Sequence, residues 1–124
     1  LADVISLHCP LTATTTKLFN DATFAVVKPG AILINTARGG LLDEAALLRA
    51  LGSGQLGGAA LDVLSEEPPA IDNLLVQSVQ PNLIITPHMA WASAEARQRM
   101  VLQLRATLES FSKGEIKNQV WPLR

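Results

Sequence analysis

Residues 28–40 read KPGAILINTARGG: a Pro-Gly stop signal, the apolar run Ala31–Asn35, and a polar segment that ends in two glycines. Three further runs have the same character, with apolar residues that do not alternate cleanly with polar ones: Asp3–Leu7, Gly58–Val63 and Leu83–Thr86. Continuous apolar runs of this length are typical of strands buried on both faces, as in a parallel sheet.

Helical segments are predicted between these runs, over Asp21–Val27 and Asp43–Leu51. A further short helix is predicted over Ile71–Val79. Strands that alternate with helices predict an α/β fold, here the second half of a doubly wound, Rossmann-type parallel sheet of four strands. The segment Gly52–Gly57, GSGQLG, has the spelling of the dinucleotide fingerprint G-x-G-x-x-G. It follows a helix and precedes a strand, the reverse of what the fingerprint needs, so we interpret it as a helix exit and turn.

A long helix is predicted after Ser93, a suitable N-cap, with Gly114 just past its end. Its apolar residues recur at helical spacing: Ala96, Met100, Val101, Leu104, Leu108 and Phe111. We therefore divide the chain into residues 1–92, which carry the sheet, and residues 93–124, a crossover helix and tail.

Composition narrows the classes of function. The chain has 124 residues, 48% of them hydrophobic, and a formal net charge of -1, so it lacks the broad basic field of a nucleic-acid binder. Cys9 is the single cysteine, which excludes an internal disulfide, and with only two histidines no metal site is predicted. No apolar run reaches the roughly 20 residues of a membrane helix, and no signal-peptide pattern is present. We expect a soluble, cytoplasmic protein; its start at Leu1, inside an apolar run, suggests a piece of a longer polypeptide.

Ligands of open parallel sheets bind outside the carboxyl ends of the strands, and each predicted strand is followed there by a polar or charged group. Arg38 is either a fork for a carboxylate or a surface arginine. His88 can exchange a proton near neutral pH, or be a structural histidine. Glu67 can form a hydrogen bond with the imidazole ring of His88, and Glu66 is an equally good candidate for this contact. Asp62, which ends an apolar strand, needs a partner if it is buried.

Six segments, in this order, resemble one known family: His8–Thr12, Lys28–Ala31, Asn35–Gly40, Leu61–Val63, Glu67-Pro68 and Thr86–His88. They are similar to the C-terminal part of the D-isomer-specific 2-hydroxyacid dehydrogenases. The resemblance runs from residue 1 to about Gly114. Trp91 and the segment SEEPP look most like the glycerate dehydrogenase (hydroxypyruvate reductase) branch.

The resemblance implies an oxidoreductase that transfers hydride between NAD or NADP and a 2-keto acid, such as hydroxypyruvate or glyoxylate, and that works as a homodimer. By the same resemblance, Arg38 would bind the substrate carboxylate, His88 would be the acid/base and would also face the cofactor, and Glu67 would be its partner. Asp62 would contact the nicotinamide carboxamide. The cofactor groove would be lined by Cys9, Pro10, Thr36, Ala37 and Arg38.

The family's fingerprint, its ribose-binding acid and most of its substrate domain would lie before Leu1. We therefore expect the 124 residues alone to be inactive, and residues 93–124 to return to the substrate domain. Two alternatives stay open. One is another branch of the family, such as D-lactate, phosphoglycerate or formate dehydrogenase, although Glu67 argues against the last, which lacks the Glu–His pair. The other is a non-catalytic, Rossmann-like interaction domain.

Overall fold

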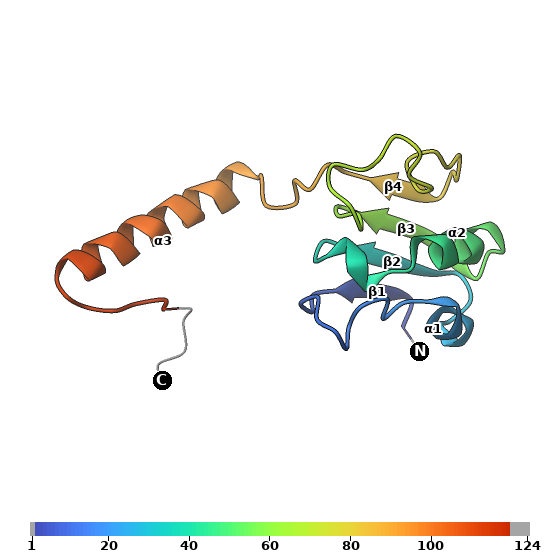
Figure 1. The fold of residues 1–124 in the computed structure, drawn as a ribbon, viewed down its shortest axis with the longest axis horizontal. Helices are drawn as coiled ribbons and strands as arrows, with labels where there is room; N and C mark the ends of the chain where they lie inside the picture. Colours follow the sequence, from blue (N-terminus) through green and yellow to red (C-terminus); the bar gives the residue numbers. More distant parts are fainter. Residues whose placement is uncertain (1, 120–124) are drawn as a thin grey trace. The chain divides into compact units, whose positions relative to one another are not determined.

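The computed structural model describes residues 2–119 and divides into two compact units, Leu1–Met89 and Ala90–Arg124, each of which is described by itself. The first unit holds a four-stranded parallel sheet in the order β1-β2-β3-β4 (Figure 1). The strands are β1 (Val4–Leu7), β2 (Ala31–Asn35), β3 (Leu56–Leu61) and β4 (Leu83–Ile85). The prediction of an α/β fold with four parallel strands is confirmed.

The third strand differs most from its predicted bounds, because it begins at Leu56 and ends at Leu61. Leu56 directly follows the turn, and its fully buried side chain makes it part of the core as the first residue of the strand. Asp62 therefore lies just beyond the strand rather than within it. The turn before it contains Gly54, whose φ of +76° is natural for glycine, as expected of a helix exit rather than a phosphate-binding loop.

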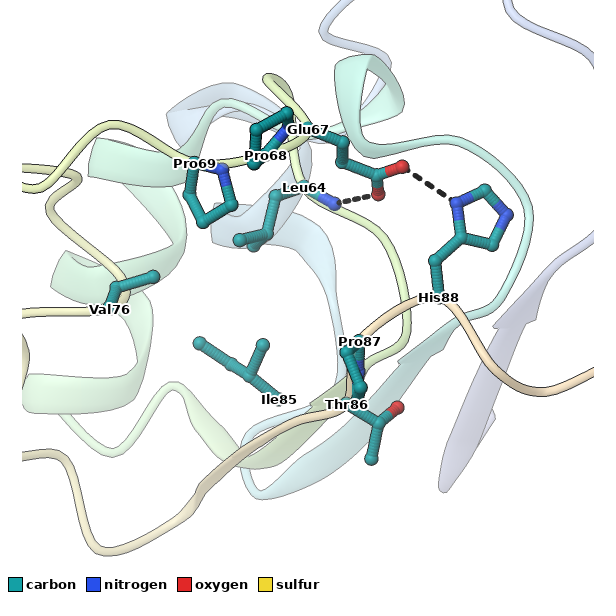
Figure 2. A pocket seen from close by; sticks show the side chains of 9 residues that line it. All are labelled: Leu64, Glu67, Pro68, Pro69, Val76, Ile85, Thr86, Pro87 and His88. Carbon is teal, nitrogen blue, oxygen red and sulfur yellow. Dashed lines mark hydrogen bonds and ion pairs between the residues drawn. The ribbon is translucent and has the colours of Figure 1, made fainter.

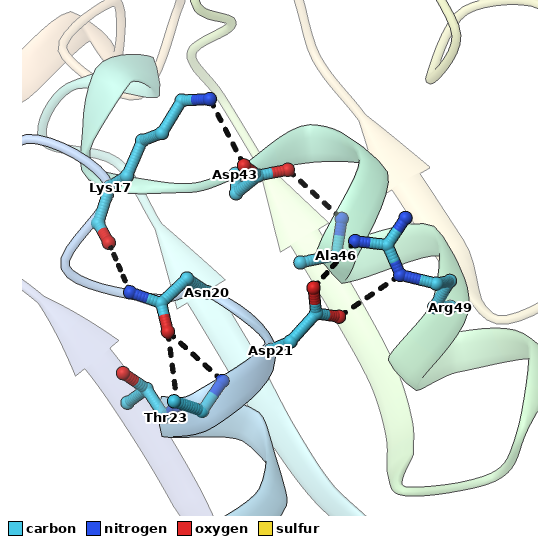
Figure 3. Close-up of polar contacts among 8 residues, drawn as sticks. Lys17, Asn20, Asp21, Thr23, Asp43, Ala46 and Arg49 are labelled. Carbon is cyan, nitrogen blue, oxygen red and sulfur yellow. Dashed lines mark hydrogen bonds and ion pairs between the residues drawn. The ribbon is translucent and has the colours of Figure 1, made fainter.

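Two α-helices connect the first three strands: α1 (Asp21–Val26) and α2 (Glu44–Gly52), the latter preceded by the short 3-10 turn η1 (Gly39–Leu41). Asn20 and Asp43 cap the two helices with their side chains, as Figure 3 shows. Arg49 on α2 binds Asp21 on α1 through both its Nε and Nη2, at 3.0 and 2.7 Å. The two helices are thereby held side by side.

The predicted helix over Ile71–Val79 is wrong, because this segment forms turns. The side-chain oxygen of Asn73 accepts hydrogen bonds from the amides of Leu75 and Val76, a local arrangement that competes with a helix. Of the apolar residues here, Leu75 enters the core, while Ile71 and Val79 are 90% and 97% exposed.

The expectation that the strands are buried on both faces is also wrong for the residues that the structure describes. One face of the sheet carries the core residues Leu33, Ala59 and Leu61, which pack with buried residues of α2 such as Leu47. On the other face Val4, Ile32 and Ile84 are exposed. Apolar side chains on both faces made the runs continuous, but within this unit only one face is covered.

The second unit contains α3 (Ala94–Ser112), shown in orange in Figure 1. Ser93 caps it by accepting a hydrogen bond from the amide of Ala96 at 3.1 Å, and Gly114 follows its end with a φ of +76°, both as predicted. Its apolar stripe is exposed along Met100, Val101, Leu104, Leu108 and Phe111. Within residues 2–119, no helix has the length and apolar character that crossing a membrane requires.

Candidate active site

The turn that bears Arg38 directly follows β2, and the side chain of Asn35, the last residue of that strand, holds it by hydrogen bonds. Asn35 is completely buried, and its side chain accepts a hydrogen bond from the amide of Ala37 and donates one to the carbonyl of Arg38. Both polar ends of the buried amide are thus used on one turn. The guanidinium of Arg38 is exposed and donates to the carbonyl of Ala37 at 2.6 Å. Asn35 therefore fixes the backbone from which this cation extends.

Glu67 and His88 face each other across the ends of two loops (Figure 2). Oε2 of Glu67 lies 2.6 Å from Nδ1 of His88, and Oε1 accepts a hydrogen bond from the amide of Leu64 at 2.9 Å. These two hydrogen bonds, the backbone one first, lower the pKa of the Glu67 carboxyl below its usual range. Glu67 is therefore ionised at neutral pH and suited to stabilise a protonated imidazole. Of the two acids left open by the sequence, Glu67 is the one that contacts His88.

His88 sits in a backbone conformation that non-glycine residues seldom adopt, with φ at +52°. Asp62 is 4% exposed, and its Oδ1 accepts hydrogen bonds from residues before and after His88 in the chain. The donors are the Thr86 hydroxyl at 2.5 Å and the Met89 amide at 2.9 Å. A buried carboxylate thus receives the partners it needs and holds the turn that carries His88.

The predicted site residues form two groups at the carboxyl ends of the strands. One is an open cleft of about 670 Å³ past β1 and β2, lined by His8, Cys9, Pro10, Leu11, Ala37 and Arg38; the exposed Thr36 directly follows β2. The other is a mostly apolar cavity of about 400 Å³ beside the Glu67–His88 pair, lined by Leu64, Glu67, Pro68, Pro69, Val76, Ile85, Thr86, Pro87 and His88. Asp62 contacts the second group through Thr86 and Met89.

Chemically, the arrangement supplies an exposed cation for an anionic ligand and an imidazole whose ring is oriented by a carboxylate. Such a pair can give or take one proton through the imidazole ring. In the part of the chain that the structure describes, no three His, Cys, Asp or Glu side chains lie where they can hold a metal ion.

Sequence reasoning missed the residues that hold these groups in place: Asn35, Thr86 and the backbone amide of Leu64. A signal was available for the first two, because each is a polar residue at the carboxyl end of an apolar run. The amide of Leu64 left none, because every non-proline residue carries such a donor.

A family model, sequence relatives and solved structures all match this chain and point to the same family of dehydrogenases. Residues 1–90 match the model of the D-isomer specific 2-hydroxyacid dehydrogenase NAD-binding domain. A glycerate dehydrogenase of Methylorubrum extorquens is 51% identical over 119 residues, which make up 96% of this chain and 38% of that protein.

Solved structures agree. A glyoxylate reductase from Paecilomyes thermophila superposes with a TM-score of 0.81 at 38% identity, over 96% of this chain and 36% of that one. An acyclic imino acid reductase in complex with NADPH and D-Arg superposes with a TM-score of 0.83 at 36% identity, over 97% of this chain and 38% of that one. The chain thus spans about two fifths of these relatives, and it belongs to the D-isomer specific 2-hydroxyacid dehydrogenase family.

Proposed function

We propose that this chain is the C-terminal part of the cofactor-binding domain of an enzyme that reduces a 2-keto acid to the D-2-hydroxy acid with NADH or NADPH. The observation that carries the proposal is the 2.6 Å contact between Glu67 and His88 at the same end of the sheet as the exposed Arg38. Hydroxypyruvate and glyoxylate are the proposed substrates, supported by the identity to a glycerate dehydrogenase and the likeness to a glyoxylate reductase.

Each proposed role follows from the chemistry of the side chain. Arg38 binds the substrate carboxylate through its planar fork and so orients the neighbouring keto group. His88 donates the proton at Nε2 to the keto oxygen as that oxygen gains negative charge. Glu67 stabilises the protonated ring and then holds the neutral ring in one tautomer.

The residues of the first cleft fit a nicotinamide cofactor. The cleft past β1 and β2, at about 670 Å³, is of the size that small-molecule sites have, and it combines the apolar Cys9, Pro10 and Ala37 with the cation of Arg38. When bound, the cofactor supplies the hydride that adds to the keto carbon. We propose that Cys9, Pro10 and the backbone of Thr36–Arg38 line its groove, and that Asp62 and His88 lie beside its nicotinamide. NAD is supported by the family description, and NADP by the NADPH held by a structural relative.

The domain organisation is proposed on the same grounds. Residues 1–92 would supply half of a doubly wound sheet, in which the exposed face of Val4, Ile32 and Ile84 is covered by the other half. Residues 93–124 would return to a substrate domain, with the exposed apolar stripe of α3 as the contacting surface. The predicted tail beyond residue 119 lies outside the described residues.

We further propose that the enzyme is a homodimer that works in the cytoplasm. The homodimer is what the family resemblance implies, and the single cysteine Cys9 suits a reducing compartment. Sedimentation of the intact polypeptide tests the first point, since a monomer at all concentrations contradicts it. Localisation of a tagged intact protein tests the second.

The decisive experiment follows NADH or NADPH oxidation by the intact polypeptide with hydroxypyruvate, glyoxylate, pyruvate and 3-phosphohydroxypyruvate. We expect saturable reduction, with hydroxypyruvate or glyoxylate giving the highest kcat/KM and a D-hydroxy acid as product. A preference for pyruvate or the phosphorylated acid would place the enzyme in another branch of the family. Cofactor binding without reduction of any 2-keto acid would instead identify a non-catalytic domain.

A further inference from the structure

Glu44, the first residue of α2, connects its helix to two loops that are distant in sequence. Its Oε1 accepts a hydrogen bond from the backbone amide of Ser65 at 2.8 Å, and its Oε2 accepts one from Nδ2 of Asn73 at 3.1 Å. A single carboxylate thus holds one loop with each oxygen. Each oxygen of the Glu44 side chain can accept a hydrogen bond, so one side chain can make both contacts at once.

The first of these loops carries Glu67. The amides of Leu64 and Ser65 are consecutive along the backbone, and they donate to two different carboxylates: Leu64 to Glu67 and Ser65 to Glu44. Only the φ and ψ angles of Leu64 separate the two peptide groups. Fixing the Ser65 amide therefore limits the directions in which the Leu64 amide can point, and that amide orients the carboxylate of Glu67.

The second loop forms the opposite wall of the cavity beside His88. Asn73 donates to Glu44 with its amide nitrogen and uses its oxygen to accept from the amides of Leu75 and Val76. Val76 lines the cavity of about 400 Å³ that Glu67 and His88 also line (Figure 2). Glu44 thereby links two loops that both contribute residues to the lining of this cavity.

The helix that bears Glu44 is itself held in place by a cap and by core packing. Asp43 caps α2 by accepting from the amide of Ala46, and a negative charge in the first turn suits the helix dipole. Leu47, one turn further along, is completely buried in the core. The carboxylate therefore extends from a backbone that has little freedom to follow the loops.

We propose that Glu44 is a positioning residue for the reduction, holding Glu67 in the orientation in which it stabilises the protonated ring of His88. The proposal rests on the function proposed above. In it Glu44 contacts neither substrate nor cofactor and acts through the Ser65 and Leu64 amides.

The test uses Glu44→Gln and Glu44→Asp in the intact polypeptide, with Arg49→Ala as the matched control. Glutamine keeps the length of the side chain but offers one acceptor in place of two; aspartate keeps the charge at the helix start but is one methylene too short. Arg49→Ala removes a contact of the same helix that points to Asp21 and not to either loop. We expect both Glu44 variants to lower kcat about 10- to 100-fold with the KM for NADH unchanged, as small misplacements of catalytic groups do.

The pH profile distinguishes positioning from a general loss of stability. Reduction by both Glu44 variants should fail at a lower pH than in the wild type, as in Glu67→Gln, and adding Glu44→Gln to Glu67→Gln should have little further effect. If Glu67→Gln changes the profile while both Glu44 variants behave like Arg49→Ala, the role of Glu44 is overturned and the proposed function stands. If Glu67→Gln itself leaves the profile unchanged, Glu67 does not act on His88 and the role of Glu44 is overturned with it. Only the absence of keto-acid reduction by the wild type overturns the proposed function. Either Glu44 variant alone decides the question if the other does not fold.

Discussion

The backbone of Gly39 packs directly against the peptide group that joins Leu64 to Ser65. A Cβ atom on Gly39 would overlap the carbonyl of Leu64 and the amide nitrogen of Ser65. Gly39 immediately follows Arg38, and Leu64 donates its amide to Glu67. This close approach therefore places the turn of the proposed carboxylate-binding cation against the loop of the proposed acid/base pair.

Gly39→Ala should destabilise the protein and disturb both loops together. Because the methyl group would meet backbone atoms, which cannot rotate away, we expect a loss of about 1–3 kcal/mol in the free energy of unfolding. Gly52→Ala is the control: the last residue of α2 has room for a Cβ, with Gln80 Nε2 3.5 Å away, and alanine favours the helix. Urea unfolding measures both. Equal stabilities of the two variants would show that the contact at Gly39 is easily relieved.

His88→Ala should lower turnover far more than it weakens cofactor binding. A general acid contributes about 10²- to 10⁴-fold to a rate, and we expect kcat for keto-acid reduction to fall within that range. Titration of NADH by fluorescence should give a dissociation constant close to that of the wild type. Arg49→Ala provides a control, since Arg49 binds Asp21 on the helices and lines neither the cleft nor the cavity. Near-normal turnover without His88 would remove it from the mechanism.

Glu67→Gln should make reduction fail at a lower pH. The hydrogen bond from the Leu64 amide, followed by that to His88, lowers the pKa of the Glu67 carboxyl, so the wild-type residue is charged throughout the neutral range. That charge favours the protonated ring that reduction consumes, so without it the rate of reduction should begin to fall at a lower pH. The pH dependence of kcat measures the shift, and Glu66→Gln is the matched control. A larger shift in the control than in Glu67→Gln would assign the role to Glu66.

The lowered pKa of Glu67 also predicts how the stability of the fold changes with pH. A carboxyl whose pKa is lower in the folded state stabilises the fold above its unfolded pKa and loses that contribution as the pH falls through the folded value. Glu67→Gln should therefore be less sensitive to acid over this interval than the wild type, which thermal melts at a series of acidic pH values would show. The effect is small, because the side chain is partly exposed.

Local patterns in the sequence were sufficient to predict the sheet, although β3 begins and ends two residues before its predicted bounds. Ala31–Asn35 is short, apolar and bounded by Pro-Gly and polar segments, so its bounds and position were predictable. Asp21–Val27 and Asp43–Leu51 were predictable from caps and stop signals that lie within a few residues. The error at Ile71–Val79 arose because one side chain, Asn73, competes for the local amides, which the apolar spacing does not reveal.

Contacts within the site were less predictable, because they join residues far apart along the chain. Asp62 and Thr86 follow neighbouring strands, and pairing at the sheet edge was foreseeable once the strand order was known. The choice between Glu66 and Glu67 depended on which side chain reaches His88, and the sequence left both open. The contacts of Glu44 with Ser65 and Asn73 span 21 and 29 residues and carry no local signature.

Arg38→Lys should reduce catalytic efficiency with keto acids while cofactor binding stays close to normal. Lysine keeps the positive charge but cannot present two parallel N–H groups to a carboxylate, and the hydrogen bond of Arg38 to the Ala37 carbonyl would also change. A hydrogen bond to a charged group contributes about 1.5–3 kcal/mol, so we expect kcat/KM to fall roughly 10- to 100-fold. Arg49→Lys is the control, because Arg49 also binds a carboxylate through two nitrogens, but on the helices and away from the strand ends. Steady-state kinetics with hydroxypyruvate and glyoxylate would measure the effect. If Arg38→Lys and Arg49→Lys gave the same kcat/KM, Arg38 would be an ordinary surface arginine and the carboxylate would have to bind elsewhere.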